Sequence, residues 1–172
     1  MCIIYLKQIG IVSYMGLYEE LVCHKLPPYT EIPGAIGPSG SRNILVTGGC
    51  GFIGSNFLNI MKSKYPYLNF VNIDSLNYCS NINNVKRGVA TFIKGNICDI
   101  ELVQRVLKEY KIDTIFHFAA QSHVDNSFID PLHFTTQNVY GTHALIEACR
   151  RTCPGVEFIH FSTDEVYGES IT

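Results

Sequence analysis

Apolar and polar positions follow no sustained period up to residue 41, after which strand-like runs alternate with helix-like spacing. Residues 27–41 concentrate proline and glycine, which break both helix and strand. We therefore expect residues 1–41 to form a poorly ordered extension and linker, and residues 42–172 to form the folded domain.

The regular part of the chain predicts five strands separated by helices. Short apolar runs predict strands at 43–47, 69–74, 91–94, 114–118 and 156–161. The spacing of Phe57, Ile60 and Met61 predicts a helix after the first strand. Asp99 and Asp130 are suited to cap two more helices, the second of which is expected to run to about residue 151.

This alternation predicts an α/β fold in which helices cover both faces of a parallel sheet. We expect a doubly wound sheet of strand order 3-2-1-4-5, truncated after about its fifth strand. In that order the carboxyl ends of strands one, four and five lie side by side, at the place where such sheets bind ligands.

Composition and charge exclude several function classes. The 172 residues are 47% apolar with a net charge of -2, which argues against intrinsic disorder and against a nucleic-acid partner. No apolar stretch approaches the roughly 20 residues that span a bilayer, and no secretory signal is evident, so we expect a cytoplasmic location. The seven cysteines are irregularly spaced and form no paired C-x-x-C motif, so we expect reduced thiols rather than a metal site.

The most informative motif is a glycine-rich turn between the first strand and the first helix, where Gly48, Gly51 and Gly54 form G-x-x-G-x-x-G. Glycines let the backbone approach a pyrophosphate, and the helix N-terminus favours its charge. Asp74, at the end of the second strand, is placed to accept both ribose hydroxyls and to repel a 2'-phosphate. These residues predict an NAD site; the alternative is a glycine turn that binds nothing, with Asp74 capping the next turn.

Two polar segments follow the fourth and fifth strands. In Phe-Ala-Ala-Gln-Ser-His-Val-Asp, small residues admit a flat cofactor, and Ser122 and His123 can face a hydroxylated substrate. Thr163 precedes Asp164 and Glu165. Of two adjacent carboxyl groups, one can stay protonated and act as a general acid, while the other is ionised and acts as a general base. The alternatives are a solvated acidic turn for the carboxyl pair and simple hydrogen bonding for His123.

Residues 43–169 resemble the N-terminal part of the extended short-chain dehydrogenase/reductases, specifically the nucleoside-diphosphate-glucose 4,6-dehydratases of the dTDP-glucose or UDP-glucose type. The resemblance is carried by Thr-Gly-Gly-Cys-Gly-Phe-Ile-Gly, Asn-Tyr-Cys-Ser-Asn, Ala-Ala-Gln-Ser-His-Val-Asp, Asn-Val-Tyr-Gly-Thr and Ser-Thr-Asp-Glu-Val-Tyr-Gly. The last motif is the most specific, because related epimerases and decarboxylases usually lack the adjacent Asp-Glu.

The resemblance implies a Rossmann-type fold, NAD as cofactor and redox-neutral dehydration to a 4-keto-6-deoxy sugar nucleotide. It implies that Glu165 removes the C5 proton, that Asp164 protonates the departing C6 hydroxyl, and that Thr163 and Ser122 hydrogen-bond the sugar near O4. A homodimer through residues 99–110 and 131–151 is also implied. The implied substrate-binding residues are Ser122, His123 and Thr163. The implied cofactor-binding residues are Gly48, Gly51, Phe52, Ile53, Gly54, Asp74, Asn77, Ser80, Asn96, Ile97, Phe118, Ala119, Ala120 and Ser122.

The sequence departs from the family's pattern in three places. Asn96 stands where the family usually has an aspartate beside the adenine, and Gln137 where it often has a threonine beside the cofactor. The family's Tyr-x-x-x-Lys motif would lie beyond Thr172, so we expect a fragment, a truncated gene product or a degenerate copy that is inactive alone. The alternatives are a non-catalytic dinucleotide-binding module and a related NAD-dependent epimerase or decarboxylase.

Overall fold

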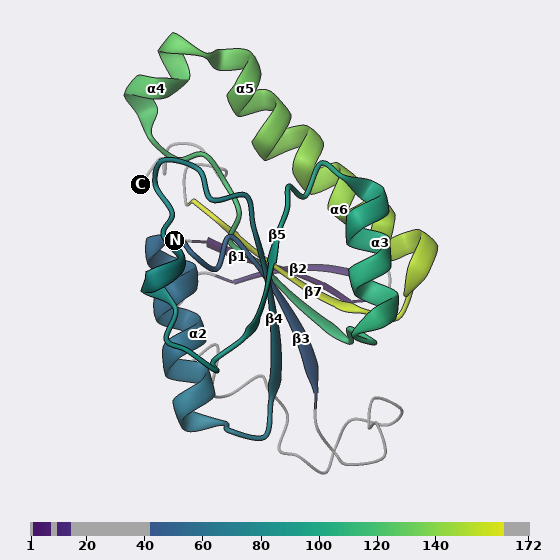
Figure 1. Cartoon of the computed structure of the whole chain (residues 1–172). Coiled ribbons are helices and arrows are strands. Elements are labelled where there is room, and N and C mark those ends of the chain that lie inside the picture. Colours follow the sequence, from purple (N-terminus) through teal and green to yellow (C-terminus); the bar gives the residue numbers. More distant parts are fainter. Residues whose placement is uncertain (1, 8–9, 15–41, 164–172) are drawn as a thin grey trace, which may run out of the picture.

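The computed structural model describes residues 2–7, 10–14 and 42–163 (Figure 1). The strands are β1 (Cys2–Lys7), β2 (Gly10–Tyr14), β3 (Asn43–Thr47), β4 (Asn69–Asp74), β5 (Thr91–Lys94), β6 (Thr114–His117) and β7 (Glu157–Ser162). The helices are α2 (Phe52–Lys64), α3 (Ile100–Glu109), α4 (Val124–Ile129), α5 (Pro131–Thr135) and α6 (Gly141–Thr152). Two short turns complete the described elements: the 3-10 turn η1 (Ile82–Asn84) and the π-helical turn η2 (Thr136–Tyr140).

One sheet joins the described strands in the order β2-β1-β7-β6-β3-β4-β5. The five strands from β3 to β7 pair in parallel, and their order confirms the predicted 3-2-1-4-5 arrangement. The predicted α/β, doubly wound fold class is therefore correct. The carboxyl ends of β3, β4 and β6 lie at one edge of this sheet, where ligands of such sheets bind.

The first two strands were not predicted from the sequence. β1 pairs antiparallel with β7, with Ile4 opposite His160, and β2 pairs antiparallel with β1. The two short runs before the linker carry no clear period of their own. The pairing of β1 with β7, at the other end of the described chain, leaves no signal among neighbouring residues, and the hairpin of β1 with the adjacent β2 was not predicted either.

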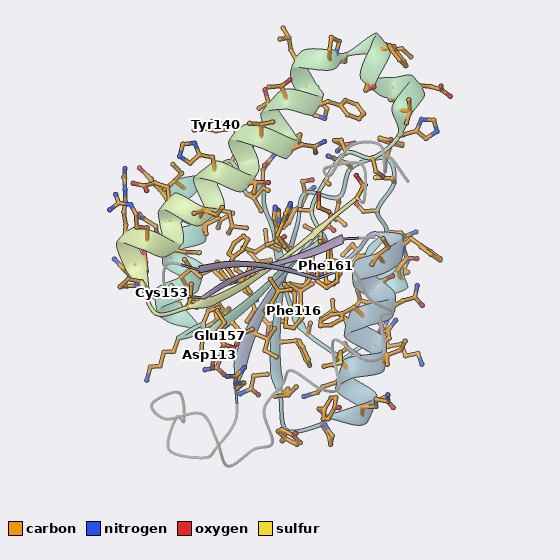
Figure 2. All side chains as sticks on the ribbon, turned by 180° about the vertical axis from the view of Figure 1, so that it is seen from behind. Asp113, Phe116, Tyr140, Cys153, Glu157 and Phe161 are labelled. Atoms are coloured by element: carbon orange, nitrogen blue, oxygen red, sulfur yellow. The ribbon has the colours of Figure 1, made fainter. Side chains whose placement is uncertain are left out.

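Helices cover both faces of the sheet, with α2 on one face and α3 and α6 on the other (Figure 1). Successive residues of a strand point to opposite faces. In β3, Ile44 and Val46 accordingly pack with α2, and Leu45 packs with α3 and α6. Phe116 of β6 joins the α2 side, where Phe57 lies 4.6 Å away between ring centroids (Figure 2). Each layer thus has its own buried apolar core.

The predicted helix caps are confirmed. Asp99 accepts a hydrogen bond from the backbone N–H of Leu102 at 2.9 Å, and Asp130 accepts one from His133 at 3.1 Å. After Asp130, α5, η2 and α6 follow one another without a break, as the predicted long helix requires. The sequence predicted neither the π-helical turn nor the short helix α4, whose first residues were expected to lie in a polar loop.

Polar side chains tie together the amino ends of β3, β6 and β7, at the edge opposite the ligand-binding edge. Arg42 donates to Glu157 at 3.0 Å and to Thr114 at 3.3 Å, and Asp113 accepts from the backbone N–H of Asn43 at 2.9 Å. Figure 2 shows Asp113 and Glu157 together at this end of the sheet. Burial raises the pKa of Asp113. In the part of the chain that the structure describes, no helix is long and apolar enough to cross a membrane.

Candidate functional site

A cavity of about 320 Å³ lies at the carboxyl ends of β3, β4 and β6. Its lining residues are Gly48, Gly51, Phe52, Ile53, Gly54, Ile73, Asp74, Ser75, Asn77, Cys79, Ser80, Gly95, Asn96, Ile97, Phe118, Ala119, Ala120, Gln121, Ser122 and Gln137. Every residue that the sequence analysis placed beside a cofactor is among them. The structure therefore brings the predicted cofactor-binding residues together around one cavity.

The glycine-rich turn forms one wall of the cavity. Two of its positions accept only glycine, because a Cβ atom would collide with neighbouring backbone. Gly48 has φ +71°, and a Cβ on it would stand 2.7 Å from the backbone of Ala119. A Cβ on Gly54 would stand 2.4 Å from the carbonyl oxygen of Gly48. The turn, α2 and the segment after β6 can approach one another this closely only with glycine at these two positions.

The N-terminus of α2 faces this wall without a side-chain cap. The N-cap residue is Gly51, and no side chain of the described residues caps the first turn of α2 with a hydrogen bond. The first turn also contains no acidic residue. The first intrahelical donor is the N–H of Ser55, which bonds to the carbonyl of Gly51. The N–H groups of the preceding helical residues have no partner inside the helix and carry the positive end of its dipole. This geometry suits a phosphate group.

Two buried side chains of β4 hold the glycine-rich turn in place. Asp74 accepts hydrogen bonds from the backbone N–H groups of Cys50 and Leu76, both at 2.8 Å. Asn72 accepts one from Gly49 at 3.0 Å and donates its Nδ2 to the sulfur of Cys50 at 3.3 Å. Burial, and next the charge of Asp74, raise the pKa of the Cys50 thiol. Asp74 thus positions the turn in addition to lining the cavity.

A buried histidine supports the part of the cavity wall that follows β6. The Nδ1 atom of His117 lies 2.6 Å from the hydroxyl of Thr47, and its Nε2 atom lies 2.9 Å from the hydroxyl of Thr142. Thr142 donates its hydroxyl proton to the carbonyl of Asn138, so Nε2 of His117 carries a hydrogen and donates. Nδ1 is then the acceptor from Thr47. Burial, and next the neighbouring His160, lower the pKa of His117 to about 3.

The same chain of hydrogen bonds reaches the loop that follows β6. Asn138, in η2, accepts from the backbone N–H of Gln121 at 2.7 Å and donates to its carbonyl at 2.8 Å. Two bonds to one residue fix both the position and the orientation of this loop. Sequence reasoning missed Asn72, His117 and Asn138 as supporting residues. For Asn72 and His117 the available signal was a polar residue inside a buried strand, which requires a hydrogen-bond partner.

The residues predicted to act on a substrate fall in different places. Ser122 lines the cavity, whereas His123 is exposed and immediately precedes α4. Thr163 is exposed beyond the end of β7 and is not among the lining residues. Asp164 and Glu165 lie outside the described residues. The structure therefore brings only Ser122 of this set to the cavity wall.

The described part of the chain contains no group of three or more His, Cys, Asp or Glu side chains that could hold a metal ion. Five of the cysteines are free thiols: Cys50, Cys79, Cys98, Cys149 and Cys153. The chemistry that the cavity offers is instead that of backbone N–H groups for an anion, a carboxylate for hydroxyl groups and small apolar residues for a flat ring.

Known proteins are similar to this chain in sequence. The sequence profile of the family described as GDP-mannose 4,6-dehydratase matches residues 45–171. A trifunctional UDP-glucose 4,6-dehydratase, UDP-4-keto-6-deoxy-D-glucose 3,5-epimerase and UDP-4-keto-L-rhamnose reductase of Arabidopsis thaliana is 49% identical over 133 residues, which cover 75% of this chain and 20% of the plant protein.

Two solved structures show the same fold. The dTDP-glucose 4,6-dehydratase of Bacillus anthracis, in complex with NAD, is 39% identical, with a TM-score of 0.66 over 76% of this chain and 40% of that one. The UDP-glucose 4-epimerase of Thermotoga maritima, with UDP-glucose, is 32% identical, with a TM-score of 0.67 over 76% of this chain and 41% of that one.

The chain spans about a fifth of the length of the plant relative and about two fifths of each of these two structures. The family profile matches residues 45–171 of the 172-residue chain, from within β3 almost to its end. The chain therefore belongs to the GDP-mannose 4,6-dehydratase family.

Proposed function

We propose that this chain binds NAD in the cavity and supplies the cofactor-binding part of a dTDP-glucose or UDP-glucose 4,6-dehydratase. The observation that carries the proposal is the meeting of the glycine-rich turn, Asp74 and residues 118–120 around one cavity. The NAD complex of the Bacillus anthracis relative supports the choice of ligand.

The residues present fit a dinucleotide. The uncapped N–H groups at the start of α2 suit the pyrophosphate, and the space left free at Gly48 and Gly54 lets it approach the backbone. Each carboxylate oxygen of Asp74 accepts one backbone hydrogen bond and retains capacity for a second, from a ribose hydroxyl.

The same residues favour NAD over NADP. A 2'-phosphate would stand beside the negative charge of Asp74, and the lining residues include no arginine or lysine to compensate for it. We expect the affinity of the chain for NAD to exceed its affinity for NADP at any ionic strength, with the smallest difference at high salt.

When bound, NAD supplies reversible hydride transfer at its nicotinamide ring. In our proposal Ser122 and Thr163 hydrogen-bond the sugar near O4, Glu165 removes the proton at C5, and Asp164 gives a proton to the hydroxyl that leaves C6. The adjacent Asp-Glu pair favours this dehydration over epimerisation. Structural likeness does not separate the two, because the dehydratase and epimerase relatives superpose equally well.

The partner we propose is a second copy of this chain, paired through residues 99–110 and 131–151, which form α3, α5, η2 and α6. Large apolar side chains are exposed on the second of these segments, at Leu132, Val139, Tyr140 and Ile146, and on the adjoining α4, at Val124, Phe128 and Ile129. Tyr140 stands on the outer side of the long helix in Figure 2. An exposed apolar surface of this kind is typical of an interaction site.

A calorimetric titration of the 172-residue chain with NAD and with NADP tests the binding proposal. We expect NAD to bind more tightly. Tighter binding of NADP would contradict the role given to Asp74, and no binding of either dinucleotide would contradict the proposed site.

Activity is tested by joining residues 1–172 to the C-terminal part of the Bacillus anthracis dehydratase and offering dTDP-glucose and UDP-glucose. We expect loss of water from one of the two sugar nucleotides, followed by mass spectrometry. Glu165→Gln should slow this loss by about 10²- to 10⁴-fold while leaving NAD binding intact, because it removes the base but keeps nearly the same volume. Undiminished exchange of solvent deuterium into C5 in that variant would exclude Glu165 as the base and make His123 the next candidate.

A further inference from the structure

Asn96 and Gln137 meet at the wall of the cavity. Asn96 follows β5, the edge strand beyond β4, whereas Gln137 lies in η2, and both line the cavity. The Nδ2 atom of Asn96 donates to Oε1 of Gln137 at 3.0 Å. Two of the three departures from the family's pattern, Asn96 and Gln137, are therefore one hydrogen-bonded pair.

The orientation of both amide groups follows from a backbone contact. The N–H of Cys98 donates to Asn96 at 2.9 Å, and a backbone N–H can donate only to the amide oxygen. The other end of the Asn96 amide is therefore its NH₂ group, and Gln137 must receive that group through Oε1. This leaves the second hydrogen of Asn96 Nδ2, the Nε2 group of Gln137 and one lone pair of the Asn96 oxygen for a ligand.

A ligand base would lie at this pair. With the pyrophosphate at the start of α2 and the ribose at Asp74, the base continues away from the turn, across β4 toward β5. An adenine presents an amino donor at position 6 and an acceptor at N7, whereas a 6-oxopurine presents acceptors at both places. Asn96 can accept from the amino group, and Gln137 can donate to N7 or to a 6-oxo group.

We infer that the Asn96–Gln137 pair sets the base specificity of the cavity, and that it admits a 6-oxopurine dinucleotide as well as an adenine dinucleotide. The inference rests on the proposed function, namely that a dinucleotide occupies this cavity. A carboxylate in place of Asn96 could only accept hydrogen bonds, and its charge would repel a 6-oxo oxygen. The neutral pair lacks that charge and offers N–H donors from both Asn96 and Gln137 as well as one acceptor, the Asn96 oxygen.

The test is a calorimetric titration of the full chain with NAD and with nicotinamide hypoxanthine dinucleotide. We expect the two dissociation constants to agree within about fivefold. Asn96→Asp should weaken binding of the hypoxanthine dinucleotide relative to NAD by at least about tenfold, because a hydrogen bond is replaced by repulsion between acceptors. Gln137→Met, which keeps the length but removes the donor, should shift the ratio in the same direction.

Asn83→Asp is the matched control, since it adds the same charge on the exposed turn η1 and should leave the ratio unchanged. A native preference for NAD above about fivefold, or an unchanged ratio in both Asn96→Asp and Gln137→Met, overturns the inference while NAD binding still supports the proposed function. If neither dinucleotide binds, the proposed function is contradicted and the inference falls with it. Thermal unfolding checks each variant; should Asn96→Asp not fold, Gln137→Met decides.

Discussion

The hydroxyl of Thr47 and the Nδ1 atom of His117 lie 2.6 Å apart, directly across the β3–β6 pair, and both residues are fully buried. The Thr47 oxygen also receives the N–H of Ala119 at 3.4 Å, on the cavity wall. This hydrogen bond requires a neutral His117 with its hydrogen on Nε2. The wall of the cavity is thereby coupled to the protonation state of a residue that does not line it.

Thr47→Val tests the contribution of this hydroxyl to stability. Valine keeps the shape of threonine but leaves the buried Nδ1 of His117 without a donor, so we expect the free energy of unfolding to fall by about 1–3 kcal/mol. Urea denaturation monitored by circular dichroism measures it. Thr91→Val on the exposed edge strand β5 is the control and should change stability by less than about 0.5 kcal/mol. Equal effects of the two substitutions would contradict the role of the Thr47 hydroxyl.

The depressed pKa of His117 predicts a stability that declines in mild acid. The pKa of His117 is about 3 in the folded chain against 6.5 when unfolded. Between pH 6.5 and pH 3 the imidazole is therefore protonated in the unfolded state but stays neutral in the folded state. The stabilisation is fully present above pH 6.5 and is lost progressively as the pH falls toward 3. The stacked ring of His160, whose pKa burial also lowers, adds to this loss.

The contribution of His117 is isolated by comparing unfolding free energies of the native chain and of His117→Gln at pH 6.5 and pH 5. The native chain should lose about 1.5 kcal/mol more than the variant over this interval, because the other titrating groups are common to both. Parallel curves for the native chain and His117→Gln would mean that His117 does titrate in the folded state.

The parts of the fold that were predictable are those with a local signal. The glycines at 48, 51 and 54, the cap at Asp99 and the cap at Asp130 each follow from short-range chemistry, and the structure confirms the elements they begin or end. The strand order followed from the alternation of strands and helices. Gly48, Gly51, Gly54 and Asp74 could be named from their places at the ends of β3 and β4, whereas the other cofactor-binding residues were implied by the family resemblance.

What escaped prediction depends on contacts between distant residues. β1 finds its partner in β7, and Asn138 clamps Gln121 only because a π-helical turn sets it there. The hydrogen bond between Asn96 and Gln137 could likewise not be predicted from the sequence, although each residue had been identified separately as a departure from the family's pattern. A sequence shows which side chains are unusual, but the pairs they form depend on the packing of the whole sheet.

Leu132→Ser tests the proposed pairing of two copies. Leu132 of α5 is 77% exposed beside Phe128 and Ile129, which are each 81% exposed. Replacing the leucine should weaken self-association, measured by sedimentation at several concentrations, by at least about tenfold in dissociation constant, if the side chain is part of a buried contact. Ile60→Ser on α2, 46% exposed on the opposite face of the sheet, should have no effect. A chain that stays monomeric at every concentration would contradict the proposed dimer.

Gly54→Ala is expected to abolish dinucleotide binding without unfolding the chain. The added Cβ would stand 2.4 Å from the carbonyl oxygen of Gly48 and 2.8 Å from the Cα of Gly49, so either the start of α2 or the glycine-rich turn must move. Both form the wall that we propose receives the pyrophosphate, and a shift of a few tenths of an ångström or more would misalign its N–H groups. The strain should cost about 1–3 kcal/mol of stability.

Gly155→Ala supplies the matched control for the same change of one methyl group. Gly155 has a negative or extended φ, and a Cβ there would meet nothing within 4 Å, so both stability and NAD affinity should remain close to native. Calorimetric titration and urea denaturation of the two variants give both quantities. Native-like NAD binding by a folded Gly54→Ala chain would show that the wall between Gly48 and Gly54 does not receive the ligand, and the dinucleotide would then have to be placed elsewhere in the cavity.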